Sequence, residues 1–136
     1  MINAKVYDGT DAILGRLGSR VARDLLKGYN VDIINCDRII VSGDKKILVY
    51  NIAAKIRMGS GSSLKGPKYP RTVDRLVKRM IRGMLPWDRT KGREAYRKLR
   101  CHISTVSVEE SIKVIKLNHR KPMKHFCIAD IVGLLK

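Results

Sequence analysis

The N-terminal third of the chain constrains the fold most strongly, because it alternates between strand and helix patterns with short turns between them. A helix is predicted from residue 12 or 13 to residue 27, with apolar residues every three or four positions and Gly28 as its stop. Strands are predicted at residues 4–7 and 31–36, and residues 39–42 form an extension or a third strand. A strand, a helix and a strand in this order form a βαβ unit, which predicts an α/β fold with a parallel sheet and a right-handed crossover.

The remainder of the chain continues the mixture of helices and strands. We predict helices at residues 45–57, from residue 71 to Pro86, and at 93–98, a Gly/Ser/Pro-rich loop at 58–70, and a strand at 99–103; residues 104–116 suit either state, and residues 126–135 form a closing strand or helix. No internal repeat or long linker interrupts these elements. We therefore expect residues 1–136 to form a single domain, within which residues 58–100 are a basic segment.

Positive charge is concentrated in the middle of the chain. Residues 65–100 hold 13 of the 29 Lys and Arg residues against three acidic residues, which is +10 of the net charge of +17, whereas residues 1–44 are neutral. Nucleic acid is the expected partner of such a cationic surface, and an anionic membrane surface is the other polyanion that fits it. Arg outnumbers Lys by eight to five in this stretch, which favours bidentate contacts with phosphate.

The helix predicted from residue 71 is amphipathic. Its apolar positions follow one stripe, and five cations occupy the other faces: Arg71, Arg75, Lys78, Arg79 and Arg82. Aromatic residues make up only 5% of the chain, so phosphate contacts are expected to dominate over stacking on bases. Trp87 has two interpretations: its ring packs against the end of the helix, or it stacks on a base.

The first helix carries a second cationic stripe. Arg16, Arg20, Arg23 and Lys27 recur at positions that share one helix face, and only Asp24 is available nearby to offset them. A solvated face and a phosphate-binding face are both consistent with this pattern.

Signals for enzymatic chemistry are weak. The Gly15-Arg-Leu-Gly18 turn lacks the first glycine of a dinucleotide-binding fingerprint, and no Walker lysine follows it. More simply, the two glycines let the helix approach another backbone closely. The three histidines and three cysteines lack metal-ligand spacing, and Cys101 and His102 point to opposite faces of a strand. We therefore predict no enzyme, no cofactor, no metal and no small-molecule substrate.

Cellular location is also constrained. Three cysteines without close pairing indicate reduced core thiols, and neither a secretory signal nor an apolar run of membrane-spanning length is present. We therefore expect a cytoplasmic protein that is not embedded in a membrane. Two alternatives from other classes stay open: an RNA-directed enzyme of Rossmann-like fold, such as a methyltransferase, and a general nucleic-acid compaction protein.

Three motifs carry a family resemblance: Leu14-Gly-Arg-Leu17, Asn35-Cys-Asp-Arg-Ile-Ile-Val-Ser-Gly43 and Arg82-Gly-Met-Leu-Pro86. In their order and spacing the chain resembles the universal L13 family of large-subunit ribosomal proteins, and its archaeal and eukaryotic branch most closely. Trp87 and Asp88 depart from the family pattern, which more often has basic or small polar residues there.

The resemblance implies a three-layer α/β sandwich with a central, mostly parallel sheet flanked by helices, plus a basic loop–helix extension. It also implies a structural constituent of the large ribosomal subunit that binds large-subunit ribosomal RNA, supports assembly and contacts neighbouring ribosomal proteins. The positions matched to the family and expected to contact RNA are Arg16, Arg20, Arg71, Arg75, Lys78, Arg79, Arg82, Lys91 and Arg93. The charge pattern of the basic segment adds Lys65, Lys68, Arg89 and Arg97.

Overall fold

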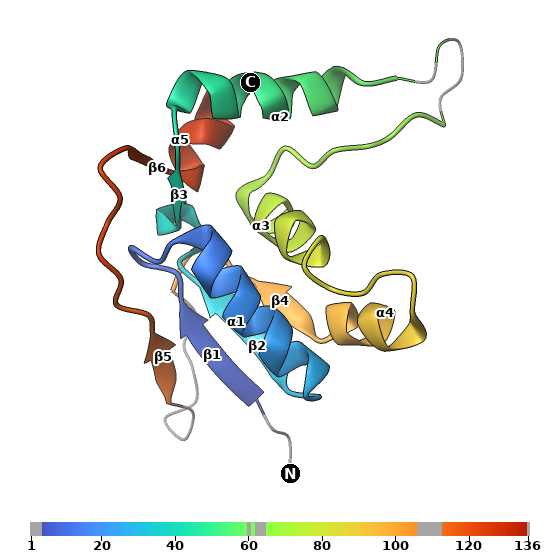
Figure 1. Ribbon diagram of the computed structural model, residues 1–136, viewed down its shortest axis with the longest axis vertical. Coiled ribbons are helices and arrows are strands. Elements are labelled where there is room, and N and C mark those ends of the chain that lie inside the picture. Colours follow the sequence, from blue (N-terminus) through green and yellow to red (C-terminus); the bar gives the residue numbers. More distant parts are fainter. Residues whose placement is uncertain (1–3, 60, 62–64, 106–112, 136) are drawn as a thin grey trace.

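The protein is a mixed α/β structure in this computed structural model, which describes residues 4–59, 61, 65–105 and 113–135 (Figure 1). Its elements in chain order are β1 (Ala4–Asp8), α1 (Leu14–Leu26), β2 (Asn30–Ile34), the 3-10 helix η1 (Cys36–Arg38), β3 (Ile40–Ser42), α2 (Lys45–Arg57), α3 (Val73–Arg82), α4 (Thr90–Arg97), β4 (Leu99–Cys101), β5 (Val114–Lys116), β6 (His125–Cys127) and α5 (Ile128–Gly133). None of the helices within this described part is long and apolar enough to cross a bilayer.

The central sheet has four parallel strands in the order β4-β2-β1-β5. Tyr7 of β1 lies between Ile33 of β2 and Ile115 of β5, and Ile33 in turn pairs with Cys101 of β4. The predicted βαβ unit is therefore confirmed as β1–α1–β2. The α/β class, with helices flanking a parallel sheet, is confirmed with it.

Two predicted segments form a separate small sheet. β3 pairs antiparallel with β6, through Val41 opposite Phe126, and neither strand joins the parallel sheet. The chain leaves β2 at Asn35, whose φ of 54° turns the backbone into η1 and away from the sheet. Residues 126–135 were predicted to form a strand or a helix, and they contain both, since the strand β6 runs directly into the helix α5.

Several predicted boundaries shift by a few residues. α3 ends at Arg82, before Pro86, and α4 begins at Thr90, three residues earlier than predicted. β2 and β4 are each shorter than predicted, and Val114–Lys116 of the ambiguous segment is a strand. The rest of that segment, at residues 106–112, lies outside the described residues.

The core lies between the sheet and the helices α1 and α3. Leu17, Val21 and Leu25 of α1 are fully buried, as are Leu76 and Ile81 of α3. These side chains cover the face of the sheet that carries Tyr7, Ile33 and Leu99. α1 ends at Leu26, and the predicted stop Gly28 follows with a φ of 99°, a conformation that glycine adopts without strain. Burial of this apolar face fixes α3 on the scaffold and leaves its other faces for contacts.

Candidate nucleic-acid interface

One face of α3 is apolar and packs in the core, and its other faces carry cations. Val73, Leu76, Val77 and Ile81 are buried in the core, which confirms the predicted amphipathic stripe. On the remaining faces Arg75 is exposed, and Lys78, Arg79 and Arg82 are half-buried. Half-buried Lys and Arg side chains commonly pack their aliphatic stems and keep their charged groups at the surface.

Aromatic rings, rather than carboxylates, hold these cations. The Lys78 ammonium lies 5.0 Å from the centre of the Tyr96 ring, and the Arg82 guanidinium carbon lies 3.8 Å from the centre of the Trp87 ring. Tyr69 holds two cations, with Lys55 Nζ at 5.7 Å and the Arg79 guanidinium carbon at 5.8 Å. A ring restricts the position of a cation without neutralising its charge, so the full positive charge stays available to a partner.

The ion pairs of the described residues lie outside this region. They join Lys5 to Asp24, Arg38 to Asp37, His102 to Asp32, Lys116 to Asp8 and Lys121 to Asp11. No Lys or Arg at described positions 68–100 is within ion-pair distance of a carboxylate. The described cations at residues 68–100 therefore form no ion pair with a carboxylate of the described ranges.

The turn after α3 is tightly packed and connects two of the sequence motifs. A Cβ added to Gly18 of α1 would lie 2.7 Å from Met84 Sδ, so the Leu14-Gly-Arg-Leu17 helix contacts the Arg82-Gly-Met-Leu-Pro86 turn. A Cβ on Gly92 would collide with the carbonyl oxygen of Pro86, and only glycine fits there. The close approach expected for the two glycines of α1 holds at Gly18, towards a side chain, but a Cβ on Gly15 would meet nothing within 4 Å.

The turn also forms a surface depression of about 350 Å³, lined by Arg79, Arg82, Gly83, Leu85, Pro86, Trp87 and Asp88. Arg79 and Arg82 are thus two predicted site residues that the structure brings together. Trp87 is half-buried, with its ring edge-to-face against Tyr96 at 5.3 Å between centres. Its carbonyl oxygen accepts a hydrogen bond of 3.0 Å from Nε of Arg93.

The cationic stripe of α1 is exposed as well. Arg16, Arg20, Arg23 and Lys27 all lie at the surface, while Asp24 is buried and interacts with Lys27 through its charge rather than in an ion pair. The Asp24 carboxylate instead accepts hydrogen bonds from the Tyr7 hydroxyl at 2.6 Å and from Lys5 Nζ at 3.0 Å. Burial and the Asp24 carboxylate raise the pKa of Tyr7 to about 12. Burial opposes ionisation of Asp24, but hydrogen bonds from Tyr7 and Lys5 outweigh it and lower the pKa of this carboxyl.

The remaining predicted residues are spread along the segment and are exposed. Lys65 and Lys68 lie on the connection between α2 and α3, Arg71 and Arg89 precede α3 and α4, and Lys91, Arg93 and Arg97 lie on α4. Arg71 shares a depression with Arg57 of α2, whereas Arg97 lies at the far end of α4 beside the edge strand β4. These two arginines are therefore not brought together.

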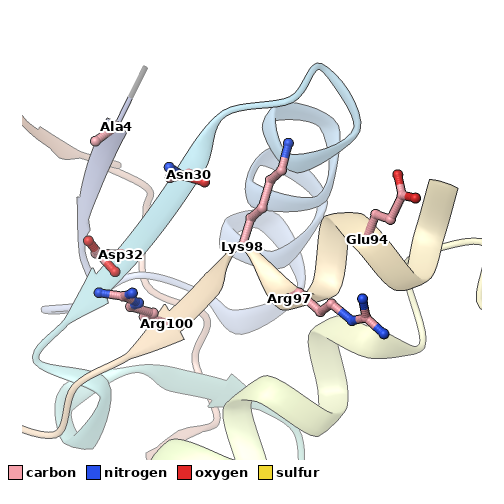
Figure 2. A pocket seen from close by; sticks show the side chains of 7 residues that line it. All are labelled: Ala4, Asn30, Asp32, Glu94, Arg97, Lys98 and Arg100. Atoms are coloured by element: carbon pink, nitrogen blue, oxygen red, sulfur yellow. The ribbon is translucent and has the colours of Figure 1, made fainter. Parts of the chain in front are cut away.

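A second depression, of about 580 Å³, lies at that far end (Figure 2). Arg97, Lys98 and Arg100 line it together with the acidic residues Asp32 and Glu94. Figure 2 shows Asp32 and Arg100 extending towards each other from the neighbouring strands β2 and β4. The mixed charge makes this depression a poorer phosphate site than the surface of α3. Lys98 and Arg100 belong to the cationic stretch of residues 65–100 but were not among the predicted site residues, whereas Lys55 lies outside that stretch and only the fold brings it to Tyr69 beside Arg79.

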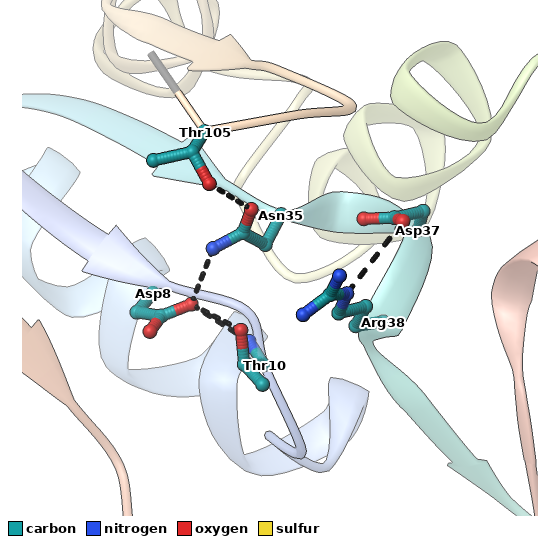
Figure 3. A network of polar contacts seen from close by, with 6 residues as sticks. All are labelled: Asp8, Thr10, Asn35, Asp37, Arg38 and Thr105. Carbon is teal, nitrogen blue, oxygen red and sulfur yellow. Dashed lines mark hydrogen bonds and ion pairs between the residues drawn. The ribbon is translucent and has the colours of Figure 1, made fainter. Parts of the chain in front are cut away.

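The carboxyl end of β1 holds a network of polar contacts (Figure 3). The Asp8 carboxylate accepts hydrogen bonds from the backbone and hydroxyl of Thr10, at 2.9 and 2.7 Å, and from Asn35 Nδ2 at 3.0 Å, and it lies 3.4 Å from Lys116 Nζ. Thr105 donates in turn to Asn35 Oδ1 at 2.8 Å. Burial opposes ionisation, but these donors outweigh it and lower the pKa of Asp8 to about 2. Asp8 is thus a fixed negative charge at the sheet edge where α/β proteins bind phosphates.

The thiols and histidines do not form a recognisable reactive centre. A hydrogen bond with Cys36, together with burial, raises the pKa of the Cys101 thiol, which keeps it protonated. All three cysteines are free, as predicted, and the fold brings Cys36 and Cys101 together from neighbouring segments. Within the described ranges, no cluster of three or more His, Cys, Asp or Glu residues suits a metal ion.

Comparison with known proteins gives one consistent family. The family described as ribosomal protein L13 matches residues 3–107. The large ribosomal subunit protein uL13 of Methanopyrus kandleri is 43% identical over 100 residues, which cover 74% of this chain and 62% of that protein. The uL13 protein of Archaeoglobus fulgidus is 42% identical over 95 residues, covering 70% of this chain and 60% of its own length.

A third relative is covered more completely. The uL13 protein of Methanosphaera stadtmanae is 34% identical over 119 residues, with 86% of this chain and 84% of that protein covered. The chain thus spans about 60% of the length of the first two relatives and most of the third. All three relatives are archaeal, in agreement with the branch that the sequence motifs indicate. The chain belongs to the ribosomal protein L13 family.

Proposed function

We propose that this protein is a structural constituent of the large ribosomal subunit, located on cytoplasmic ribosomes, and that it binds large-subunit ribosomal RNA and supports subunit assembly. Residues 1–136 act as one domain in this proposal, and residues 58–100 form the RNA-contact segment. The contact residues are the thirteen predicted cations, with α3 at their centre. The protein has a positioning role and catalyses no reaction.

The observation that carries the proposal is the absence of carboxylate partners for the described cations at residues 68–100, in a chain of the L13 family. Elsewhere in the described chain, buried carboxylates such as Asp24 are paired internally. Aromatic rings fix the position of these cations but leave their charge without a carboxylate partner. Binding of a polyanion then provides the opposite charge, and the release of its counterions favours the complex.

RNA binding is tested by measuring affinity for a large-subunit ribosomal RNA fragment over a series of salt concentrations. We expect the logarithm of the association constant to fall linearly with the logarithm of the salt concentration, with a slope that corresponds to several phosphates. A small-subunit RNA fragment and a DNA duplex of matched length serve as competitors. A flat salt dependence contradicts the proposal, and preference for the DNA duplex favours general compaction instead.

An RNA-directed enzyme of Rossmann-like fold is disfavoured by the network at Asp8. A nucleotide cofactor at the carboxyl end of β1 would place its phosphates near a carboxylate that is buried and ionised above about pH 2. Calorimetry with nucleotide and methyl-donor cofactors tests this point directly. Saturable binding at micromolar concentrations would restore the enzyme as a candidate.

We also infer that α2 contacts a neighbouring protein of the subunit. α2 contacts α5 and buries Ile52, while Ile47 and Tyr50 of α2 and Met58 just after it are exposed at 60%, 73% and 58%. Flanking cations such as Lys55 suit a partner with an apolar centre and an acidic rim, and they disfavour a second copy of this basic chain.

The α2 contact is tested by changing Ile47 and Tyr50 together to Lys. Added charge does not weaken the attraction to naked RNA, but it removes the apolar contact. We therefore expect unchanged RNA affinity together with reduced retention on large subunits during salt washing. Equal retention of this variant and the unmodified protein would remove α2 from the interface.

A further inference from the structure

We propose that the depression beside Arg82 and Trp87 binds one unpaired nucleobase of the RNA, stacked against this pair. The inference rests on the proposed RNA-binding function and assigns a distinct chemical task to one site within it. Most of the basic surface attracts phosphates of any sequence. This depression differs in that a guanidinium and an indole ring, both of which can stack on a base, lie together in its lining.

The lining of the depression separates it from a phosphate site. Trp87, Pro86 and Leu85 contribute apolar surface, and the Arg82 guanidinium lies over the indole ring with its carbon 3.8 Å from the ring centre. Guanidinium planes and indole rings are both stacking partners for bases. Asp88 adds a carboxylate to the rim, which repels a phosphate but accepts hydrogen bonds from the amino groups of a base.

The size of the depression also fits one base. Its volume of about 350 Å³ lies at the lower end of the range of small-molecule sites. Gly83 leaves part of its wall without a side chain, and Arg79 lies at its margin, where it can bind the phosphate attached to the stacked nucleotide.

The stacking pair is fixed before any ligand arrives. The Trp87 carbonyl accepts a hydrogen bond from Arg93 Nε at 3.0 Å, and the backbone N–H of Arg89 donates to the Pro86 carbonyl at 3.2 Å. Tyr96 packs edge-to-face on Trp87, which sets the orientation of the indole ring. A site that is already ordered loses little conformational entropy on binding, so a single stack contributes effectively to affinity.

Trp87 is the only tryptophan of the chain, so its fluorescence reports on this site alone. The test titrates the full-length protein with three RNA probes that carry the same number of phosphates: a short single strand, a fully paired duplex, and a single strand in which abasic sites replace the bases. Fluorescence anisotropy of a label on the RNA measures binding, and tryptophan emission measures stacking.

We expect all three probes to bind, and only the single strand with bases to quench Trp87 emission to saturation. The variant Trp87→Leu should bind that single strand about tenfold more weakly and bind the duplex only about threefold more weakly, the smaller loss being that of the ring that positions Arg82. Trp87→Phe, which keeps a ring, should restore most of the loss. Circular dichroism establishes that each variant is folded, and the titration of the unmodified protein decides the question if one of them is not.

Two results overturn the inference, and they are distinguishable from failure of the proposed function. Equal quenching by the abasic probe, or binding of the single strand without quenching, shows that the depression takes no base while RNA binding itself stands. Failure of every probe and of ribosomal RNA to bind by anisotropy overturns the proposed function, and the inference falls with it.

Discussion

The β1–α1–β2 unit and the α3–α4 region use charge in opposite ways. In the first, the carboxylates of Asp8 and Asp24 are buried and satisfied by donors within the protein, so their charge stabilises the fold. In the second, Lys78, Arg79 and Arg82 rest on aromatic rings and have no carboxylate partner among the described residues. The contrast indicates that the buried carboxylates of the first unit stabilise the fold, whereas the exposed cations, on α3 and α4 and also at Arg16 and Arg20 of α1, are available to a partner.

The largest expected effect comes from reversing charge on α3. Arg79→Glu combined with Arg82→Glu should weaken binding to ribosomal RNA roughly 100-fold, about 3 kcal/mol, because two phosphate contacts become repulsive. The slope of the salt dependence should also fall by about two. Both quantities come from binding titrations at several salt concentrations.

A matched control separates local contacts from total charge. Arg120→Glu with Lys124→Glu makes the same change in net charge at exposed positions between β5 and β6. We expect a much smaller loss of affinity for this pair. If both double variants lose affinity equally, the division of the molecule into a binding region and a scaffold is wrong.

The next largest effect is on stability, from Asp24→Asn. This change removes the charge that Lys5 and Tyr7 contact in the core and should lower the free energy of unfolding by about 2.5 kcal/mol. Affinity for RNA should change less than twofold under conditions where the variant is folded. Urea denaturation gives the free energy of unfolding. Loss of RNA affinity in the folded variant would contradict the assignment of Asp24 to folding alone.

The lowered pKa of Asp8 predicts how the free energy of unfolding depends on pH. Its pKa is about 2 in the folded protein and close to 3.8 in the unfolded chain, so its contribution of about 2 kcal/mol is fully present above pH 4 and is lost as the pH falls towards 2. Asp8→Asn should flatten this part of the curve of unfolding free energy against pH. An unchanged curve would show that other carboxyl groups dominate acid unfolding.

The smallest effect concerns the rings that hold the cations. Tyr69→Leu removes the platform shared by Lys55 and Arg79 and should weaken RNA binding about threefold, or about 0.7 kcal/mol, with an unchanged salt slope. Tyr50→Leu is the control, since Tyr50 is exposed on α2 and lies in none of these cation–ring pairs. A change in salt slope for Tyr69→Leu would mean that the ring does more than position charge.

The features with long periodic patterns could be predicted from the sequence. α1 and α3 were recognised because apolar residues recur over three or more turns, and the turn at Gly28 marked the end of α1. The pairing of β3 with β6 could not be predicted, since strands of three residues carry almost no periodic signal. The early start of α4 was missed because Gly92 indicates a turn, whereas here it is required by the nearby Pro86 carbonyl.

The candidate site, like the fold, could be predicted from the sequence only in part. Charge density alone located the basic segment, because neighbouring positions on one helix share its surface. Three contacts depend instead on how separate segments pack, which a single sequence does not encode locally. They join Arg82 to Trp87, Lys78 to Tyr96 and Cys36 to Cys101. The open choice for Trp87 was of this kind, and both alternatives have a structural counterpart: its ring packs on Tyr96 and also lines a depression.

The contact between Gly18 and Met84 has a consequence for the order of ribosome assembly. It joins the first helix of the chain to the turn that shapes the central RNA surface, although 66 positions separate the two residues in the sequence. An isolated peptide of residues 65–100 would keep the charge but lose the support that gives the turn its form. Under the proposed function we therefore expect the tertiary fold to form before RNA is bound, because the turn takes its support from α1 of the same chain.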